Sequence, residues 1–429
     1  MERYQEYKDS GEQWLGEIPS HWEMRKMKYT FRERSEKGFP NEPLLAATQS
    51  HGVILKTDYE GRTVEATKGL DTLKLVEIGD FVISLRSFQG GLEYAYNRGI
   101  ISPAYTILNP TNITKDYFKY LAKSQVFISL LKSTITGIRE GQNIDYSKLK
   151  ENLMPIPPIG EQVKMGQHLD RITAQIDKAI AQQQRMIDLL NERKQIIIQH
   201  AVTKGLDPNA EMVDSGVEWI GTIPKHWETI RLNYCSWIRA RLGWKGLKAD
   251  EYVSNGYPFL SAFNIVNNKM SWEKLNYINK FRFDESPEIK LQEGDILLVK
   301  DGAGIGKCAR VDNLPYGEAT ANGSLAFITP NDKVFYKYLH YFIVSDSFGK
   351  YKELLITGMG VPHLTQGEIK KMRIPVPPIK EQVEISKYLD HHIDQIDDSI
   401  KIVEQRIILL RERKQIIINE VVTGKVKVS

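Results

Sequence analysis

Two long stretches of the chain carry apolar residues at the spacing of one helix face. In the first stretch, steps of three, four and seven separate Leu169, Ile176, Ile180, Ile187, Leu190 and Ile197. Adding 220 to each number gives Leu389, Ile396, Ile400, Ile407, Leu410 and Ile417. This spacing is typical of a coiled-coil seam, and a Pro-Pro pair favours a helix start just before each stretch. We expect two helices of about 40 residues, roughly 60 Å each. Two amphipathic helices in a globular core are the alternative.

The segments between these stretches have a different pattern. Short β-type runs occur at 79–88, 104–110, 294–301 and 324–330, with frequent Gly, Asn and Pro around them. Helical patterns follow at 113–133 and 334–355. Each interior is therefore expected to be a mixed α+β globule of about 150 residues.

The chain also contains an internal repeat. Many residues of 9–29 recur 205 positions later, among them Asp9, Trp14, Gly16, Pro19, His21, Trp22 and Tyr29. Further along, PIPPIGEQV (155–163) returns as PVPPIKEQV (375–383), and ERKQIII (192–198) returns at 412–418. The interiors between these blocks differ, since LLAATQSHGVILK has no counterpart in YPFLSAFNIVNNK. A repeated frame thus encloses two divergent interiors.

These patterns predict an α+β chain with a pseudo-two-fold internal repeat. Two globules, at 1–153 and 214–373, would be separated by long helices at 154–203 and 374–425, with a linker at 204–213. We expect the helices to pair as an antiparallel coiled coil, which would put the globules at opposite ends.

Composition narrows the class of protein. Hydrophobic residues make up 41% and charged residues 26%, which fits a folded, soluble chain. The start is charged and no apolar run reaches about 18 residues, so neither a secretory signal nor a membrane helix is expected. Cys235 and Cys308 cannot form a disulfide framework, which favours a cytoplasmic location.

Charge gives no global signal for a nucleic-acid partner. The net charge is +4, with 21 basic and 19 acidic residues over 1–150, and 19 basic and 20 acidic over 206–370. Neither globule is basic as a whole. Any attraction to DNA must therefore come from short loops and partner subunits.

Several motifs resemble catalytic or metal sites but differ from them in their residues or in their expected surroundings. DGAGIGKC (301–308) has Asp301 in place of the first Gly of a phosphate-binding loop and Cys308 in place of its hydroxyl. His391 and His392 with the nearby aspartates are read as a solvated helix face rather than a metal site. No nucleophile elbow or dinucleotide fingerprint is present, so we expect no catalysis and no metal.

Polar and basic loops are the candidate DNA contacts, because Arg pairs with guanine, and Gln and Asn pair with adenine. In the first globule these are Thr48, Gln49, Ser50, His51, Arg86, Ser87, Gln89, Arg139, Gln142 and Asn143. In the second they are Arg239, Arg241, Lys245, Ser261, Asn264, Lys300, Lys307, Asn322, Ser324 and His363. Arg239, Arg241 and Lys245 lie in an acid-free stretch, 229–248, with interleaved tryptophans. Ordinary polar turns are the alternative for each.

These motifs together resemble the specificity subunit of type I restriction–modification enzymes. The resemblance rests on WLGEIPSHWEMRKMK and WIGTIPKHWETIRLN, on PIPPIGEQ and PVPPIKEQ, and on ERKQIIIQHAVTKGLDP and LRSFQGG. It covers nearly the whole chain, and several motifs occur twice in the same order.

The resemblance implies a function. In that family each globule is a target-recognition domain for one half of a bipartite double-stranded DNA sequence. The helices act as a ruler and dock two modification (methyltransferase) subunits. S-adenosylmethionine, ATP and Mg²⁺ would be held by partner subunits, including restriction/translocase subunits, and not by this chain. A related methylase-only or type IIB-like system, a self-contained enzyme and a coiled-coil scaffold without a DNA role are the alternatives.

Overall fold

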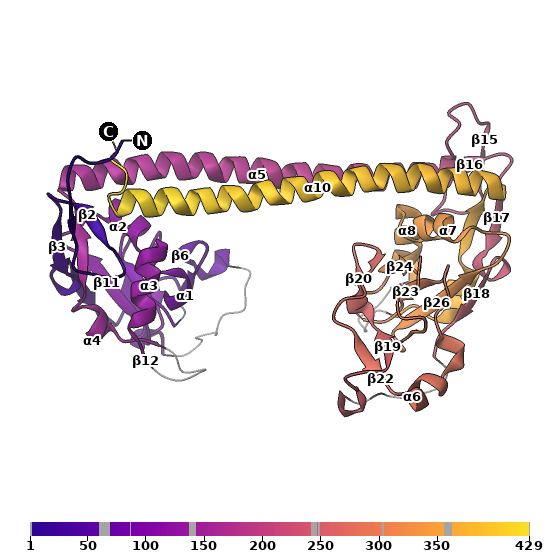
Figure 1. The fold of residues 1–429 in the computed structure, drawn as a ribbon, viewed down its shortest axis with the longest axis horizontal. Helices are drawn as coiled ribbons and strands as arrows, with labels where there is room; N and C mark the ends of the chain where they lie inside the picture. Colours follow the sequence, from indigo (N-terminus) through magenta and orange to yellow (C-terminus); the bar gives the residue numbers. More distant parts are fainter. Residues whose placement is uncertain are drawn as a thin grey trace. The chain divides into compact units, whose positions relative to one another are not determined.

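The computed structural model describes residues 2–59, 69–85, 87–136, 143–241, 247, 249–302, 304–355 and 363–428. The chain divides into two compact units. Unit 1 consists of residues 1–184 and 404–429, and unit 2 of residues 185–403 (Figure 1). Each unit combines a mixed globule with a part of both long helices, so the α+β class is confirmed.

The two long helices are present. α5 (Ile159–Lys204) and α10 (Ile379–Val422) each begin directly after a Pro-Pro pair. A glycine with positive φ follows each helix within two residues, Gly205 at 73° and Gly424 at 72°, a conformation in which a residue with a Cβ would be strained. The periodic pattern therefore predicted both helices correctly.

Unit 1 is built around a four-stranded sheet in the order β4-β11-β8-β9. Its strands are β4 (Phe31–Arg34), β8 (Phe81–Ile83), β9 (Glu93–Tyr94) and β11 (Thr106–Pro110). Paired strands surround it: β1 (Tyr7–Asp9) with β2 (Glu17–Pro19), β3 (Glu23–Lys26) with β14 (Leu153–Ile156), β5 (Leu45–Thr48) with β6 (Gly52–Leu55), β7 (Lys74–Val76) with β10 (Gly99–Ile101), and β12 (Ile135–Thr136) with β13 (Asn143–Ile144). The helices are α1 (Ser87–Gly90), α2 (Lys115–Leu121), α3 (Gln125–Ser133) and α4 (Tyr146–Leu149).

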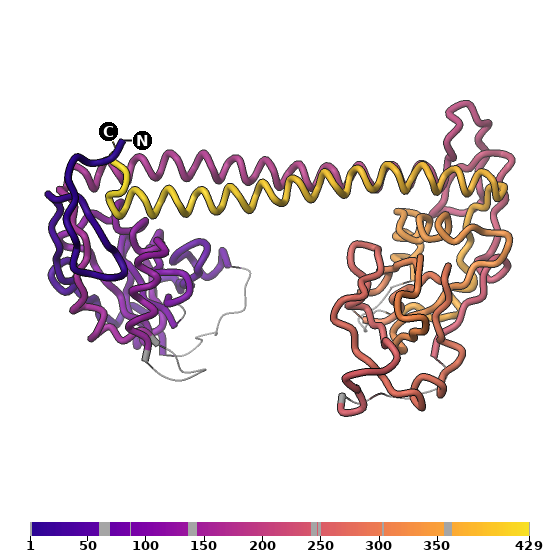
Figure 2. Tube along the Cα trace, in the orientation of Figure 1, coloured from indigo at the N-terminus to yellow at the C-terminus, as the bar shows by residue number. Residues whose placement is uncertain are grey.

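The core of unit 1 joins this sheet to both long helices. The Phe81 and Phe118 rings are 4.7 Å apart, and Leu169 of α5 and Val421 of α10 are buried in the same cluster. The last part of α10 thus lies beside the first part of α5 within this unit. Both chain termini lie here too (Figure 2), where the Lys427 amide donates to the Glu2 carbonyl at 2.8 Å.

Unit 2 is built around a six-stranded sheet in the order β18-β26-β23-β24-β21-β20. Its strands are β18 (Ser236–Arg239), β20 (Ile265–Val266), β21 (Lys269–Met270), β23 (Ile296–Val299), β24 (Cys308–Arg310) and β26 (Leu325–Pro330). A second sheet has β22 (Asn276–Ile278), β19 (Tyr257–Leu260) and β25 (Thr320–Ala321), and β15 (Met212–Asp214) pairs with β16 (Thr222–Pro224) and β17 (Glu228–Arg231) with β27 (Arg373–Val376). The helices are α6 (Lys280–Asp284), α7 (Tyr336–Ile343), α8 (Asp346–Leu355) and α9 (Gln366–Lys371).

The β-type runs of the interiors became strands β8, β11, β23 and β26, with one difference. The run 79–88 forms a strand only over Phe81–Ile83 and then turns into the short helix α1. The helical pattern at 113–133 is likewise two helices, because the Ser124 side chain accepts the Phe127 amide and starts α3 anew. The second pattern divides in the same way into α7 and α8.

Short 3₁₀ turns complete the described part of the chain. They are η1 (Met27–Tyr29), η2 (Lys56–Asp58), η3 (Leu70–Thr72), η5 (Leu232–Tyr234), η6 (Ala249–Glu251), η7 (Ala262–Asn264) and η8 (Pro287–Ile289).

Candidate nucleic-acid interface

The repeated motifs attach each globule to the start of a long helix. In unit 1 the Trp22 indole donates to Glu161 at 3.1 Å, and the His21 ring lies 2.6 Å from the same carboxylate. Burial acts to raise the pKa of Glu161, but hydrogen bonds from Tyr4, His21 and Trp22 outweigh it and hold the pKa below its ordinary value. The carboxylate is therefore charged near neutral pH.

Unit 2 makes the same contacts with its own residues. The Trp227 indole donates to Glu381 at 3.1 Å, and the His226 ring lies 2.9 Å from that carboxylate. The IP-x-HW and EQ blocks that recur in the sequence are thus the two sides of one structural joint.

A buried glutamine completes each joint. Gln162 accepts the Thr114 amide at 2.7 Å and donates to the Pro157 carbonyl at 2.8 Å. Gln382 accepts the Phe335 amide at 2.7 Å and donates to the Pro377 carbonyl at 2.7 Å.

Each globule also holds the end of the other long helix. The Tyr117 hydroxyl donates to the carbonyl of Val422, at the end of α10. In unit 2 the Tyr338 hydroxyl donates to the carbonyl of Val202, near the end of α5. Both tyrosines are fully buried, so these bonds lie in the unit cores.

In unit 1 the structure brings two of the candidate loops together. The side-chain amide of Gln49 donates to the side-chain carbonyl of Gln89 at 3.4 Å. This hydrogen bond joins the turn after β5 to helix α1. Lys123 holds both segments, donating to the carbonyls of Gln49 at 3.3 Å and Gly90 at 3.0 Å. Exposed Gln49, Ser50, His51 and Gln89 therefore share one edge of the unit.

Two candidates of unit 1 have a structural role instead. Thr48 is buried, donates to the Gly52 carbonyl at 3.0 Å and accepts the His51 amide at 3.0 Å. Ser87 is fully buried and accepts the Ser84 amide at 2.8 Å. Because these hydroxyls close turns from within, we correct their assignment as DNA contacts. The turns that they close present the exposed side chains.

Some candidates of unit 1 cannot be placed. Arg86, Arg139 and Gln142 lie outside the described residues. Asn143 begins β13, opposite Thr136 of β12. Their assignment as DNA contacts stays a prediction.

In unit 2 four candidate loops meet through backbone hydrogen bonds. The Asn322 amide donates to the Leu260 carbonyl at 2.8 Å, and the Lys300 amide donates to the Ser324 carbonyl at 2.9 Å. The Leu364 amide in turn donates to the Lys300 carbonyl at 2.8 Å. The segments that carry Ser261, Lys300, Lys307, Asn322, Ser324 and His363 therefore form one cluster, here called the unit 2 loop cluster.

The side chains of the unit 2 loop cluster differ in how freely they could contact a bound partner. Lys307 is exposed. Lys300 lies 2.5 Å from Asp301, whose carboxylate also pairs with His363. The Asn322 side chain accepts the Ser324 hydroxyl at 2.6 Å. Among these side chains, the Lys307 ammonium group is therefore the most available to an anionic partner. Lys300, Asn322 and His363 are already held by neighbouring side chains.

Two arginines of the acid-free stretch 229–248, Arg239 and Arg241, lie in the interior of unit 2. The Arg239 side chain is 4% exposed and lies 2.5 Å from Asp295, which is fully buried. It also donates to the carbonyls of Glu288 at 3.1 Å and Lys290 at 2.7 Å. We therefore correct Arg239, which is part of the core and cannot reach a phosphate.

Of the two other basic candidates in this stretch, one is also buried and one lies outside the described residues. The Arg241 side chain is 8% exposed and lies 3.5 Å from Glu285, so it too is corrected. Lys245 lies outside the described residues. The assignment of Asn264 is corrected as well, since it is buried and its side chain accepts the Ser261 amide at 3.0 Å.

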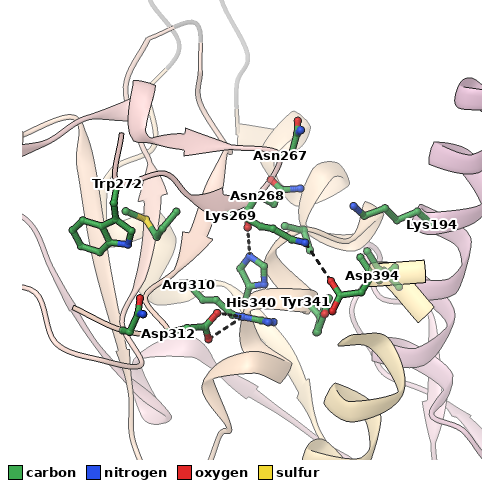
Figure 3. A pocket seen from close by; sticks show the side chains of 15 residues that line it. Lys194, Asn267, Asn268, Lys269, Trp272, Arg310, Asp312, His340, Tyr341 and Asp394 are labelled. Carbon is green, nitrogen blue, oxygen red and sulfur yellow. Dashed lines mark hydrogen bonds and ion pairs between the residues drawn. The ribbon is translucent and has the colours of Figure 1, made fainter. Parts of the chain in front are cut away.

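A cavity of about 350 Å³ lies in unit 2 behind the hairpin β20–β21. Figure 3 shows Lys269 pointing toward Asp394 and His340 toward the backbone of Asn268. His340 is buried, and burial, aided by Arg310, lowers its pKa to about 3, so the ring is neutral near pH 7. Its Nε2 lies 3.1 Å from the Asn268 carbonyl, to which the neutral ring donates.

The cations of this cavity are already paired. Lys269 lies 3.3 Å from Asp394 and 3.0 Å from Asp397, and Lys194 lies 2.6 Å from Asp397. The Lys269 pairs attach the hairpin to α10, and Asp397 of α10 in turn pairs with Lys194 of α5. The ion pairs beside the cavity thus hold the hairpin that follows the Ser261–Asn264 turn.

The other chemical motifs have structural surroundings. Within the described ranges, no group of three or more His, Cys, Asp or Glu side chains is arranged to hold a metal ion. Cys308 is fully buried as the first residue of β24, which pairs with β23. None of the described helices is both long and apolar enough to cross a lipid bilayer.

Two features of the candidate interface were missed from the sequence. Lys123 joins the unit 1 loops, but it lies about 30 to 70 residues from its partners and no local pattern reveals it. Phe263 is 92% exposed between two residues that were singled out, Ser261 and Asn264. An aromatic residue inside a polar turn is the signal that could have found it.

Comparison with known proteins agrees with the resemblance inferred from the motifs. Residues 224–408 match the type I restriction modification DNA specificity domain. Two relatives from Methanocaldococcus jannaschii are each 25% identical to this chain. The type I restriction enzyme MjaVIII specificity subunit aligns over 87% of this chain and 86% of its own length. The putative type I restriction enzyme MjaX specificity subunit aligns over 96% of both.

A solved structure has the same fold. It concerns complex assembly and conformational transition of the type I R-M system, and it matches with a TM-score of 0.65 at 16% identity, over 95% of this chain and 99% of that one. The chain therefore resembles type I restriction–modification specificity subunits along nearly its whole length, and the resemblance is confirmed.

Proposed function

We propose that this chain is the sequence-specific DNA-recognition subunit of a type I restriction–modification complex. Its two globules, predicted at 1–153 and 214–373, would each read one half of a bipartite target. The observation that carries the proposal is that each unit combines loops far apart in sequence, brought together by hydrogen bonds, with the same kind of Trp–Glu helix joint.

The two half-sites should differ in sequence. Unit 1 presents Gln49 and Gln89, which suit adenine, together with His51. The unit 2 loop cluster presents Lys307, with Asn322 and His363 held by neighbours. Because the frames are alike and the loops are not, the target is asymmetric.

We propose that α5 and α10 pair as an antiparallel coiled coil that sets the spacing of the half-sites. In unit 1 Asp177 pairs with Lys414 at 2.7 Å, and in unit 2 Lys194 pairs with Asp397 at 2.6 Å. From Asp177 to Lys194 α5 advances 17 residues, and from Lys414 to Asp397 α10 goes back by the same 17. One antiparallel register fits both pairs, and the half-sites would lie about one DNA turn apart.

The helices would also dock two modification subunits. Leu189 and Ile196 of α5 are 44% and 60% exposed, and seven residues place them on one helix face. Leu409 and Ile416, 220 residues later, are 62% and 54% exposed. Two equal apolar surfaces, one in each unit, suit two copies of one partner.

The chemistry would belong to the partners. This chain would hold no cofactor, and S-adenosylmethionine, ATP and Mg²⁺ would bind to modification and restriction/translocase subunits. Such a complex would act on DNA in the cytoplasm.

Methylation mapping tests the proposal directly. The chain is produced with its modification subunits in a host without other methylases, and methylated adenines are mapped across the genome. We expect two different short sequences separated by a fixed unspecified spacer. A continuous palindrome, or no methylation that depends on this chain, would refute the proposal.

A further inference from the structure

Phe263 is almost fully exposed at the centre of the turn between β19 and β20. The residue is 92% exposed, more than any other large apolar residue in the described part of the chain. Moving a large aromatic side chain out of water contributes a large favourable free energy to binding. A phenylalanine that touches so little of its own chain is therefore available to a partner.

The turn that carries Phe263 is rigidly held. The Ser261 hydroxyl accepts the Phe263 amide at 3.3 Å, and the Asn264 side chain accepts the Ser261 amide at 3.0 Å. Asn264 is buried and donates to the carbonyls of Ser271 at 3.3 Å and Glu273 at 3.4 Å. The ring is thus presented from a fixed backbone, which reduces the entropy lost on binding.

The surroundings of this ring are polar and belong to the unit 2 loop cluster. Ala262 adjoins the 301–307 loop, since a Cβ placed on Gly304 would lie 3.9 Å from the Ala262 methyl group. That loop carries exposed Lys307, and the Asn322 amide bonds the carbonyl just before Ser261. An exposed aromatic ring beside cationic and amide groups matches the composition of a nucleic-acid surface.

We propose that Phe263 inserts as a wedge between two stacked base pairs in the half-site that unit 2 reads. This inference rests on the proposed function. A thymine methyl group would cover only one edge of the ring, whereas an opened base step covers both faces. Because pyrimidine–purine steps unstack most easily, unit 2 would favour a TA or CA/TG step at that position.

The test uses the full-length chain and duplexes that carry the target found by methylation mapping. Adenines along the unit 2 half-site are replaced one at a time by 2-aminopurine, whose fluorescence rises when it unstacks. Wild-type protein should raise the fluorescence at one step only. Phe263→Ala should abolish the rise and weaken binding roughly 10- to 100-fold, with Phe263→Leu in between.

A matched control is available in the same unit. Phe281 of α6 is 73% exposed, and Phe281→Ala should leave both affinity and fluorescence unchanged. Unchanged melting temperatures of all variants would show that the exposed substitutions leave the fold intact.

The outcomes separate the inference from the proposed function. Wild-type protein that does not distinguish target from scrambled duplex would refute the proposed function itself. If wild-type protein discriminates but Phe263→Ala binds equally well, or weakens all sequences equally without a fluorescence change, the wedge is overturned. Loss of modification-subunit binding in Phe263→Ala, with DNA binding intact, would also overturn it.

Discussion

The ammonium group of Lys123 lies 2.6 Å from the buried carboxylate of Glu93. The same group donates to the carbonyls of Gln49 and Gly90, so one ion pair supports both loops of the unit 1 edge. Burial raises the pKa of Glu93 to about 7, although Lys123 acts to lower it.

This pKa predicts a pH dependence of stability. The ordinary pKa of Glu is 4.5, so the folded protein binds a proton at Glu93 more tightly than the unfolded chain. The stabilisation from this group is complete below pH 4.5 and is lost as the pH rises through about 7. Glu93→Gln should flatten the fall in stability between pH 5 and 8. Urea unfolding across that range measures this, and equal slopes for both proteins would contradict it.

The Lys123 contacts predict a defect in one half-site. Lys123→Met combined with Glu93→Gln removes the ion pair without leaving a buried charge, while Gln49 and Gly90 lose their shared donor. We expect weaker discrimination at the unit 1 half-site and no change at the other. Competition binding with duplexes scrambled in one half-site measures this. Equal loss at both half-sites would assign Lys123 a general structural role.

The assignment of Arg239 to the core predicts a stability defect. Arg239→Met leaves the fully buried Asp295 carboxylate without its cation, which should cost about 3–5 kcal/mol in the free energy of unfolding. Lys307→Ala, at an exposed position, should change it by less than about 0.5 kcal/mol but weaken DNA binding and its salt dependence. Urea unfolding and salt titrations measure both. A stable Arg239→Met protein that fails to bind DNA would restore the original interpretation.

Arg239 also shows why the sequence could not reveal the site fully. Its partner Asp295 is 56 residues away, so an acid-free stretch appeared basic although its arginine is neutralised within the core. The same limit applies to the Gln49 and Gln89 contact, which depends on how distant loops fold together. The long helices were predictable because their spacing is local. The Trp22 and Trp227 joints recur because the sequence itself repeats.

The exposed apolar residues of the helices predict the stoichiometry of the complex. Replacing Leu189 and Ile196 together by glutamate should weaken one docked modification subunit by about 100-fold or more and leave the other bound. The corresponding change at Leu409 and Ile416 should release the second. Mass measurement of the purified complex would show one partner instead of two. Glu192→Ala, an exposed polar control on α5, should retain two.

The antiparallel register that we propose for α5 and α10 predicts how to change the spacer. Deleting a heptad from one helix alone would break the pairing of Asp177 with Lys414 or of Lys194 with Asp397. Deleting 180–186 together with the facing 405–411 keeps both pairs and shortens the helices by about 10 Å. That distance corresponds to about three base pairs at 3.4 Å each. Methylation mapping should then show a shorter spacer between unchanged half-sites, whereas altered half-site sequences would show that the helices do more than separate the two readers.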